Sequence, residues 1–234
     1  MRPWSVLPAA LIALSLGPLD AGAQKRSFPL HLAPTLGWYK PTQDLKRVPG
    51  EASADWTRIA SAPMAGLTAE LGLPIPALSL RGGVMYVNSD LAARRFAGFE
   101  SCGSNCEKAT YRTDPVAGSQ IYIAVADVLL RGPLLGPVQP YIVGGGGVKR
   151  YNFAQGELSD GYEVEYARDV TQRTSHVGIG TDVRLGGQLI AVEVSDYVSG
   201  FRSAAAPGAT GSAALGGKRQ HDISVTIGLR IGIR

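Results

Sequence analysis

The stretch Ile223-Ser224-Val225-Thr226-Ile227-Gly228-Leu229-Arg230-Ile231-Gly232-Ile233 decides the fold class, because its apolar and polar residues alternate without a break. Every odd-numbered position is aliphatic, and every even-numbered position is small, polar or charged. A period of two is the pattern of a β-strand whose two faces meet different surroundings. The end of the chain is therefore predicted to be a strand with one fully apolar face.

The same alternation predicts seven further strands upstream. Together the predicted strands cover residues 28–40, 63–73, 77–88, 118–131, 139–151, 173–185, 188–200 and 220–234. No long window after residue 27 shows a convincing helical stripe. A strand content this high is typical of a barrel or a sandwich.

The lengths of the connections between these strands alternate. The long ones cover residues 41–62, 89–117, 152–172 and 201–219, and the short ones cover residues 74–76, 132–138 and 186–187. A membrane barrel has short turns at one end and long loops at the other, whereas a Greek-key sandwich mixes loop lengths at both ends. The sequence therefore predicts an all-β fold, an eight-stranded antiparallel up-and-down transmembrane β-barrel.

The turn at Gly186-Gly187 gives an independent test of the strand register. A two-residue hairpin turn requires Leu185 and Gln188 to face the same side. With this register, the apolar residues of both flanking strands fall on one face. The predicted hairpin and the predicted apolar face therefore agree.

The composition excludes several classes of protein. Glycine accounts for 30 of the 234 residues, and only 18% of the residues are charged, which fits neither a disordered chain nor a helical bundle. The net charge of +4 is not concentrated in any run of Lys and Arg, so no nucleic-acid partner is expected. No apolar run long enough for a membrane helix follows the first twenty residues, which excludes a helical span in the mature chain but not a membrane barrel.

Residues 1–23 have the features of a cleaved signal peptide. Arg2 precedes a mostly apolar stretch from Val6 to Leu19, and Ala21-Gly22-Ala23 matches the small residues of a cleavage site. The alternative, an N-terminal membrane anchor, is disfavoured because the apolar stretch is short and contains two prolines. Residues 24–234 are predicted to form the barrel domain of an exported protein.

The only two cysteines, Cys102 and Cys106, lie close together in a predicted long loop. In an exported chain they are expected to form a small local disulfide. Two thiols with no histidine nearby do not make a structural zinc site, and redox chemistry is the less favoured alternative.

Charged residues occur on the strand face opposite the aliphatic stripe. These residues are Glu70, Arg81, Asp127, Arg131, Asp182, Arg184, Glu193 and Arg230. If that face lines the barrel interior, or lumen, the four acids and four bases can pair with one another. If the face is exterior, they are ordinary solvated charges, but the core would then depend on alanine-rich segments that offer little bulk. We therefore predict a lumen charge network.

Aromatic residues occur near the long-loop ends of several predicted strands. Those at a shared level are Trp38, Tyr86, Tyr122, Tyr151 and Tyr197, with Phe28 and Tyr141 expected at the opposite rim. A ring of aromatic residues at one level is the pattern that membrane barrels place at the lipid headgroups. The five residues at the long-loop end are therefore predicted to form an aromatic girdle.

The chain resembles the small eight-stranded outer-membrane β-barrels of bacteria, of the OmpA-transmembrane-domain or OmpX type. The resemblance rests on this architecture and on the segments Gly37-Trp38-Tyr39-Lys40-Pro41-Thr42, Leu71-Gly72-Leu73-Pro74 and Gln139-Pro140-Tyr141. It implies a bacterial outer-membrane location and contact with outer-membrane lipids and lipopolysaccharide. It also implies periplasmic chaperones and the barrel-assembly machinery as partners during biogenesis, and a monomeric barrel. The chain departs from the family at its end, where Gly232-Ile233-Arg234 replaces the usual final aromatic residue.

Candidate catalytic and ligand sites are few in the sequence. Some outer-membrane barrels of this kind are lipid-modifying enzymes with a His-x-Ser pair, but His31, His176 and His221 are not followed by serine at that spacing. Two of these histidines, His31 and His176, are expected in the lumen, and His221 is expected at the outer rim. The run Gly144–Gly147 lacks the Lys-Ser or Lys-Thr of a phosphate-binding loop and is expected instead to allow close strand packing. The acidic loop around Glu157 lacks calcium-binding spacing. No cofactor or metal is expected.

The function predicted from the sequence is structural and interactive. An eight-stranded barrel has an interior just large enough to be filled by side chains, so free diffusion of solutes is not expected. We therefore expect a non-enzymatic barrel that supports envelope integrity and presents external loops. The alternatives are a narrow or gated pore, a lipid-modifying enzyme, and a soluble periplasmic barrel that binds a ligand.

Overall fold

The structure is a computed structural model in which ten strands and no helix are seen in the described residues. The described residues are 29–43, 46–47, 56–75, 77–101, 107–154, 169–200 and 219–233. The predicted signal peptide, the cysteine pair and the acidic loop around Glu157 lie outside these residues. No helix of the described residues is long and apolar enough to cross a membrane.

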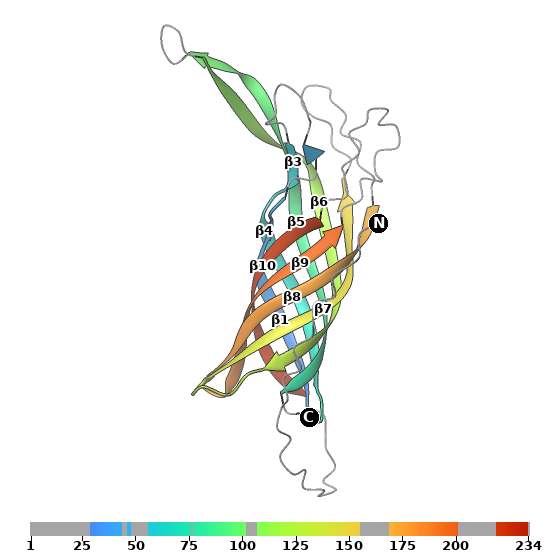
Figure 1. Ribbon diagram of the computed structural model, residues 1–234, viewed down its shortest axis with the longest axis vertical. Helices are drawn as coiled ribbons and strands as arrows, with labels where there is room; N and C mark the ends of the chain where they lie inside the picture. Colours follow the sequence, from blue (N-terminus) through green and yellow to red (C-terminus); the bar gives the residue numbers. More distant parts are fainter. Residues whose placement is uncertain are drawn as a thin grey trace, which may run out of the picture.

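Eight long strands form a closed antiparallel barrel (Figure 1). They are β1 (Leu30–Pro41), β4 (Ala62–Gly72), β5 (Leu78–Ser101), β6 (Glu107–Arg131), β7 (Val138–Phe153), β8 (Asp169–Leu185), β9 (Gln188–Gly200) and β10 (Arg219–Ile233). Each strand pairs with its neighbours in the chain, β1 pairs with β10, and the ladder between β5 and β6 completes the circle. The predicted eight-stranded antiparallel barrel is confirmed.

The strands are staggered around the barrel. Lys40 on β1 pairs with a residue of β10, and the chain of paired residues can be followed from there around the whole barrel. It returns to β1 at Leu30, so the start and the end of the path differ by ten residues (40 − 30). An offset of this kind requires the strands to tilt against the barrel axis. The height of a residue along the barrel axis therefore depends on both the pairing register and the strand tilt. It cannot be read from the position of the residue within its strand alone.

The two ends of the barrel differ as the connection lengths predict. Short turns join β4 to β5, β6 to β7 and β8 to β9. At the opposite end, longer stretches separate β1 from β4, β7 from β8 and β9 from β10, whereas β5 and β6 are themselves extended and only residues 102–106 lie between them. In the turn between β8 and β9, Gly186 and Gly187 have φ values of 54° and 87°. A two-residue hairpin turn with both central residues at positive φ matches the twist of the flanking strands and favours glycine at both positions.

The long-loop end contains more strand than the sequence pattern predicts. Residues 89–117 were expected to be a loop, but most of them extend β5 and β6 into a hairpin that projects beyond the barrel (Figure 1). Two short strands extend the sheet here: β3 (Trp56–Ile59) pairs with β5, and β2 (Lys46–Arg47) pairs with β3. The alternation of apolar and polar residues is weak here because the two faces of this part of the hairpin do not border different surroundings such as lipid and lumen. Register shifts at Leu91/Ala92 and Phe96/Gly98 interrupt the alternation further.

The side chains of the barrel are sorted in the opposite way to those of a water-soluble barrel. Large aliphatic residues cover the outer surface, whereas eight charged side chains of the described barrel strands are buried inside: Glu70, Arg81, Asp127, Lys149, Asp182, Glu193, Asp222 and Arg230. The exposed aliphatic residues include Leu36, Val84, Ile142, Ile179, Val194, Val225, Ile227 and Ile231. Apolar side chains are also found inside near the long-loop end, where Tyr39, Met64, Val87, Ile121 and Tyr151 belong to one buried cluster.

Candidate functional site: the ion-paired lumen

The buried charged residues of the lumen form three layers along the barrel axis. Nearest the short turns is the short-turn layer, made of Glu70, Arg131, Asp182 and Arg230. The central layer consists of Arg81, Asp127, His176 and Glu193. The long-loop layer consists of Lys149 and Asp222 together with Tyr39 and Tyr151. These layers are the strongest candidate for a functional site in the described residues.

The short-turn layer is a closed ring of two arginines and two carboxylates from four different strands. Arg131 lies 2.5 Å from Glu70 and 3.4 Å from Asp182. Arg230 contacts the same two acids, pairing with Glu70 and lying 2.9 Å from Asp182. Ser79 accepts a further hydrogen bond from Arg131 at 2.7 Å. Each acid therefore has two cationic partners, so loss of one arginine leaves the other in place.

The central layer has a single arginine between two carboxylates. Arg81 lies 3.2 Å from Asp127 and 2.5 Å from Glu193, and all three side chains are buried. Glu193 also accepts hydrogen bonds from Ser195 at 2.6 Å and from Tyr141 at 3.0 Å. Buried carboxylates require charged or hydrogen-bonding partners, and here a single arginine, Arg81, serves two of them.

His176 completes the central layer. Its Nδ1 atom lies 2.9 Å from Asp127, and its ring stacks on Tyr197 with ring centroids 4.5 Å apart. Its Nε2 atom is buried and has no hydrogen-bond partner. The prediction that His176 is a lumen residue agrees with this position, and His31 lies half-buried on the lumen side of β1 near the short turns.

Glycines allow the side chains of non-adjacent strands to meet across the strand between them. Gly145 on β7 pairs with Asp127 on one side and with His176 on the other, and a Cβ atom at Gly145 would collide with Asp127 and the β6 backbone. In the same way, Gly180 lies under the ring of Tyr141 and between Tyr141 and Glu193. The glycine run that resembled a phosphate-binding loop thus provides the space in which the central layer assembles.

The long-loop layer was not predicted from the sequence. Lys149 pairs with Asp222, donates to Ser199 at 3.3 Å, and lies over the rings of Tyr39 and Tyr151 at 5.8 Å and 5.5 Å. Parity could have identified Asp222, which is an even number of residues from Arg230 and therefore shares its face. Lys149 was obscured by the preceding glycines, which interrupt the pattern of β7.

One member of the predicted charge network does not belong to it. The structure brings seven of the eight predicted residues together in the first two layers, but Arg184 is exposed. It is on the lumen face by parity, yet it lies two residues before the Gly186 turn and beyond the short-turn layer. At that position the barrel ends and its side chain is in solvent.

The predicted aromatic girdle is only partly correct. Trp38, Tyr86 and Tyr122 are exposed on the outer surface, and the rings of Tyr86 and Tyr122 are 5.2 Å apart. Tyr151 and Tyr197, in contrast, are buried in the lumen, as is Tyr141, which was expected at the opposite rim. The prediction took the level of these residues along the strands into account but not their face, and odd-numbered residues of β7 and β9 point inward. Phe28 lies outside the described residues.

Among the described residues, no three His, Cys, Asp or Glu side chains are arranged so that they could hold a metal ion. The remaining histidine, His221, lies on the outer face with its Nδ1 atom 2.7 Å from Asp196. This pair is partly exposed at the outer rim, where His221 was expected.

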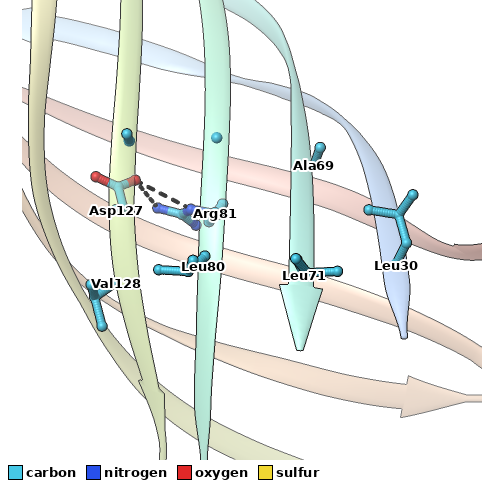
Figure 2. Close-up of a pocket in the computed structure, with 9 residues that line it drawn as sticks. Leu30, Ala69, Leu71, Leu80, Arg81, Asp127 and Val128 are labelled. Atoms are coloured by element: carbon cyan, nitrogen blue, oxygen red, sulfur yellow. Dashed lines mark hydrogen bonds and ion pairs between the residues drawn. The ribbon is translucent and has the colours of Figure 1, made fainter. Parts of the chain in front are cut away.

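A shallow apolar depression occurs on the outer wall of the barrel (Figure 2). Small residues of a single cross-strand row, Ala69, Gly82 and Ala126, lie at its floor, and the larger Leu71, Leu80 and Val128 lie beside them. Arg81 and Asp127, which also border it, are buried and paired with each other. The lining of the depression is therefore mainly hydrocarbon.

The comparisons with known proteins concern the fold. No protein-family model and no curated protein matches the chain. Among solved structures, the chain is similar to Neisserial surface protein A, with 12% identity and a TM-score of 0.48 over 86% of this chain and 97% of that one. It is also similar to the outer membrane protein OprG from Pseudomonas aeruginosa, with 13% identity and a TM-score of 0.47 over 88% and 95% of the two chains. A third similar structure is Ail, the attachment invasion locus protein of Yersinia pestis, with 10% identity and a TM-score of 0.39 over 86% and 99%.

Proposed function

We propose that this chain is a non-enzymatic barrel of the bacterial outer membrane that supports the envelope and presents its long loops and the β5–β6 hairpin to the outside. The observation that best supports this proposal is the distribution of side chains, with aliphatic residues on the outer surface and ion-paired residues in the lumen. Only a hydrocarbon environment makes such an outer surface favourable, and a closed barrel satisfies the backbone within it. The short turns then face the periplasm, and the hairpin faces outward.

The lipid contact of the outer wall can be tested with Ile179, which is 66% exposed on β8. In a bilayer, the Ile179→Arg variant is expected to lower the free energy of unfolding by about 2–4 kcal/mol, because a charge on the lipid face near the midplane is poorly solvated. In a water-soluble barrel the same exposed substitution would change the stability by less than about 0.5 kcal/mol. The measurement is urea unfolding in phospholipid vesicles, with folding followed by the difference in gel mobility between unheated and boiled samples.

The matched control is Asn88→Arg, which adds the same charge to an exposed position above the aliphatic band. Its expected cost is about 0–1 kcal/mol, because charges near the interface remain hydrated. Equal effects of the two variants would contradict the membrane orientation.

Proteolysis of intact cells tests which end of the barrel faces outward. It should cut the β5–β6 hairpin and spare the turns at the other end.

The main alternative is a narrow or gated pore. The three charged layers occupy the lumen at successive levels, and their members are joined directly to one another. We therefore expect no sustained ionic conductance from the folded protein in planar bilayers. Conductance steps whose size changes in Glu70→Gln or Glu193→Gln would instead favour the pore, because an ion path would have to pass these carboxylates.

A further inference from the structure

The central layer has an excess of negative charge unless its histidine is protonated. Asp127 and Glu193 each carry one negative charge, and Arg81 provides one positive charge. The short-turn layer, in contrast, balances two arginines against two carboxylates, and the long-loop layer balances one lysine against one aspartate. An uncompensated charge inside a barrel is costly. The central layer therefore requires a second cation, and His176 is its remaining member.

Both ring nitrogens of His176 face carboxylates. Nδ1 lies 2.9 Å from Oδ1 of Asp127, and Nε2 lies 3.8 Å from Oε1 of Glu193, a separation that suits charge attraction but is too long for a hydrogen bond. Among the described residues, the buried Nε2 atom has no hydrogen-bond partner. A neutral imidazole carries a hydrogen on only one nitrogen, so either tautomer would turn a lone pair toward a carboxylate oxygen. A protonated ring has an N–H group on both sides and is the form that suits both neighbours.

The other groups around His176 also accommodate a cation. Its ring stacks on Tyr197 of β9, with an angle of 13° between the two planes, and the face of a tyrosine ring attracts positive charge. Arg81 of β5 is held by the same two carboxylates. Tyr141 of β7 donates its hydroxyl hydrogen to Glu193. In the described part of the chain, the ring thus meets two carboxylates, one arginine and two tyrosines.

We propose that His176 is protonated in the folded barrel and serves as the second cation of the central layer. It then links β8 to Asp127 on β6 and to Glu193 on β9, and the charges of the layer sum to zero. Loss of this proton at higher pH leaves two carboxylates with one arginine and weakens the layer. The central layer is therefore a pH-sensitive clamp inside the barrel. This inference goes beyond the proposed function and does not depend on it, because it uses only contacts within the lumen.

The first test observes the proton directly in the full mature chain, prepared with isotope-labelled histidine and folded in a neutral detergent. At about pH 7.5, one unit above the ordinary histidine pKa of about 6.5, an unperturbed ring is about one-tenth protonated. We expect the His176 ring instead to show hydrogen on both nitrogens in proton–nitrogen correlation spectra. His176→Gln identifies the signal by its absence, and contact with the ring of Tyr197 identifies it if that variant does not fold. Hydrogen on only one nitrogen at this pH would overturn the proposal.

The second test is the pH dependence of stability, measured by urea unfolding in phospholipid vesicles between about pH 7 and pH 8. In this range the unfolded chain has largely released its histidine protons, whereas the folded barrel retains the one on His176. Because the folded state then binds one more proton, the folding equilibrium constant falls as the pH rises, by up to about tenfold per pH unit. We expect the parent protein to show this loss relative to His176→Gln.

Two further variants serve as controls for the second test. Glu193→Gln removes the excess negative charge but keeps the histidine, so it should weaken the pH dependence. His31→Gln removes a half-buried histidine that belongs to none of the three layers, so it should leave the pH dependence in place. An unchanged dependence in His176→Gln or Glu193→Gln, or its loss in His31→Gln, would refute the clamp.

Discussion

Replacing Arg81 with methionine is expected to lower the free energy of unfolding by about 3–5 kcal/mol, the usual result of removing one partner of a buried ion pair. Arg81 is the arginine of the central layer, and it contacts both Asp127 and Glu193 inside the barrel. Without it, two carboxylates remain close together in a lumen with little access to water. Methionine retains much of the side-chain volume, so the loss reports mainly on charge. Urea unfolding in phospholipid vesicles provides the measurement.

Two further variants separate charge from packing at this position. Arg184→Met removes an exposed arginine at the barrel end and should change the stability by less than about 0.5 kcal/mol. The triple variant Arg81→Met/Asp127→Asn/Glu193→Gln leaves no unpaired charge among these three residues and should recover a large part of the loss, since neutral replacements of buried ion pairs are well tolerated. If the triple variant is as unstable as Arg81→Met, the ion pairs do not explain the effect.

Arg230→Ala should lower the free energy of unfolding by less than Arg81→Met does, because Arg131 continues to contact both Glu70 and Asp182.

Gly147→Ala is expected to prevent the barrel from folding or to reduce its yield severely. A Cβ atom at this position would overlap the carbonyl group of Ala124 on the paired strand β6. The obstacle is backbone and not the end of a flexible side chain, so β6 and β7 would have to separate. Because both strands belong to a closed ring, a local separation distorts the remaining ladders as well. Folding yield by the gel-mobility difference is the appropriate measurement, since an unfolding titration requires a folded starting state.

The same glycine run supplies the control. A Cβ atom at Gly144 would meet its nearest neighbour, the carbonyl oxygen of His176, at 3.9 Å, which is an ordinary contact. Gly144→Ala should therefore fold with nearly the yield of the parent protein and change its stability by no more than about 1 kcal/mol. Similar yields for the two alanine variants would show that close packing between β6 and β7 is not the reason for the glycine at position 147.

The fold could be predicted from the sequence because a membrane barrel repeats one simple rule. Each wall residue faces either hydrocarbon or lumen, so period-two alternation marks the strands, and the short and long connections mark the two ends. The predicted strand ending at residue 131 matches the end of β6, and the predicted strand 188–200 matches β9. The rule fails where the surroundings on both faces become alike, and the extension of β5 and β6 beyond the barrel was therefore missed.

The candidate site could be predicted only in outline. Parity identified the carboxylates and arginines that face the lumen, but Tyr151 and Tyr197 were assigned by level alone and placed on the wrong face. Lys149 was overlooked because the glycines before it carry no side chain that would show the period. The position of Arg184 depends on where the barrel ends, which is a property of the assembled ring and not of β8 by itself.

The sequence by itself therefore determined the strand pattern, the turn at Gly186-Gly187, the inverted distribution of polarity and the face of most charged residues, because these are local consequences of alternation. Only the tertiary structure decided which charges meet. Arg81 and Glu193 are 112 residues apart, and Glu70 and Arg230 are 160 residues apart. Their contacts depend on the ten-residue stagger that closes the ring and on glycines such as Gly145 and Gly180 that open the space between strands. These are properties of eight strands packed together, and no single segment of the sequence contains them.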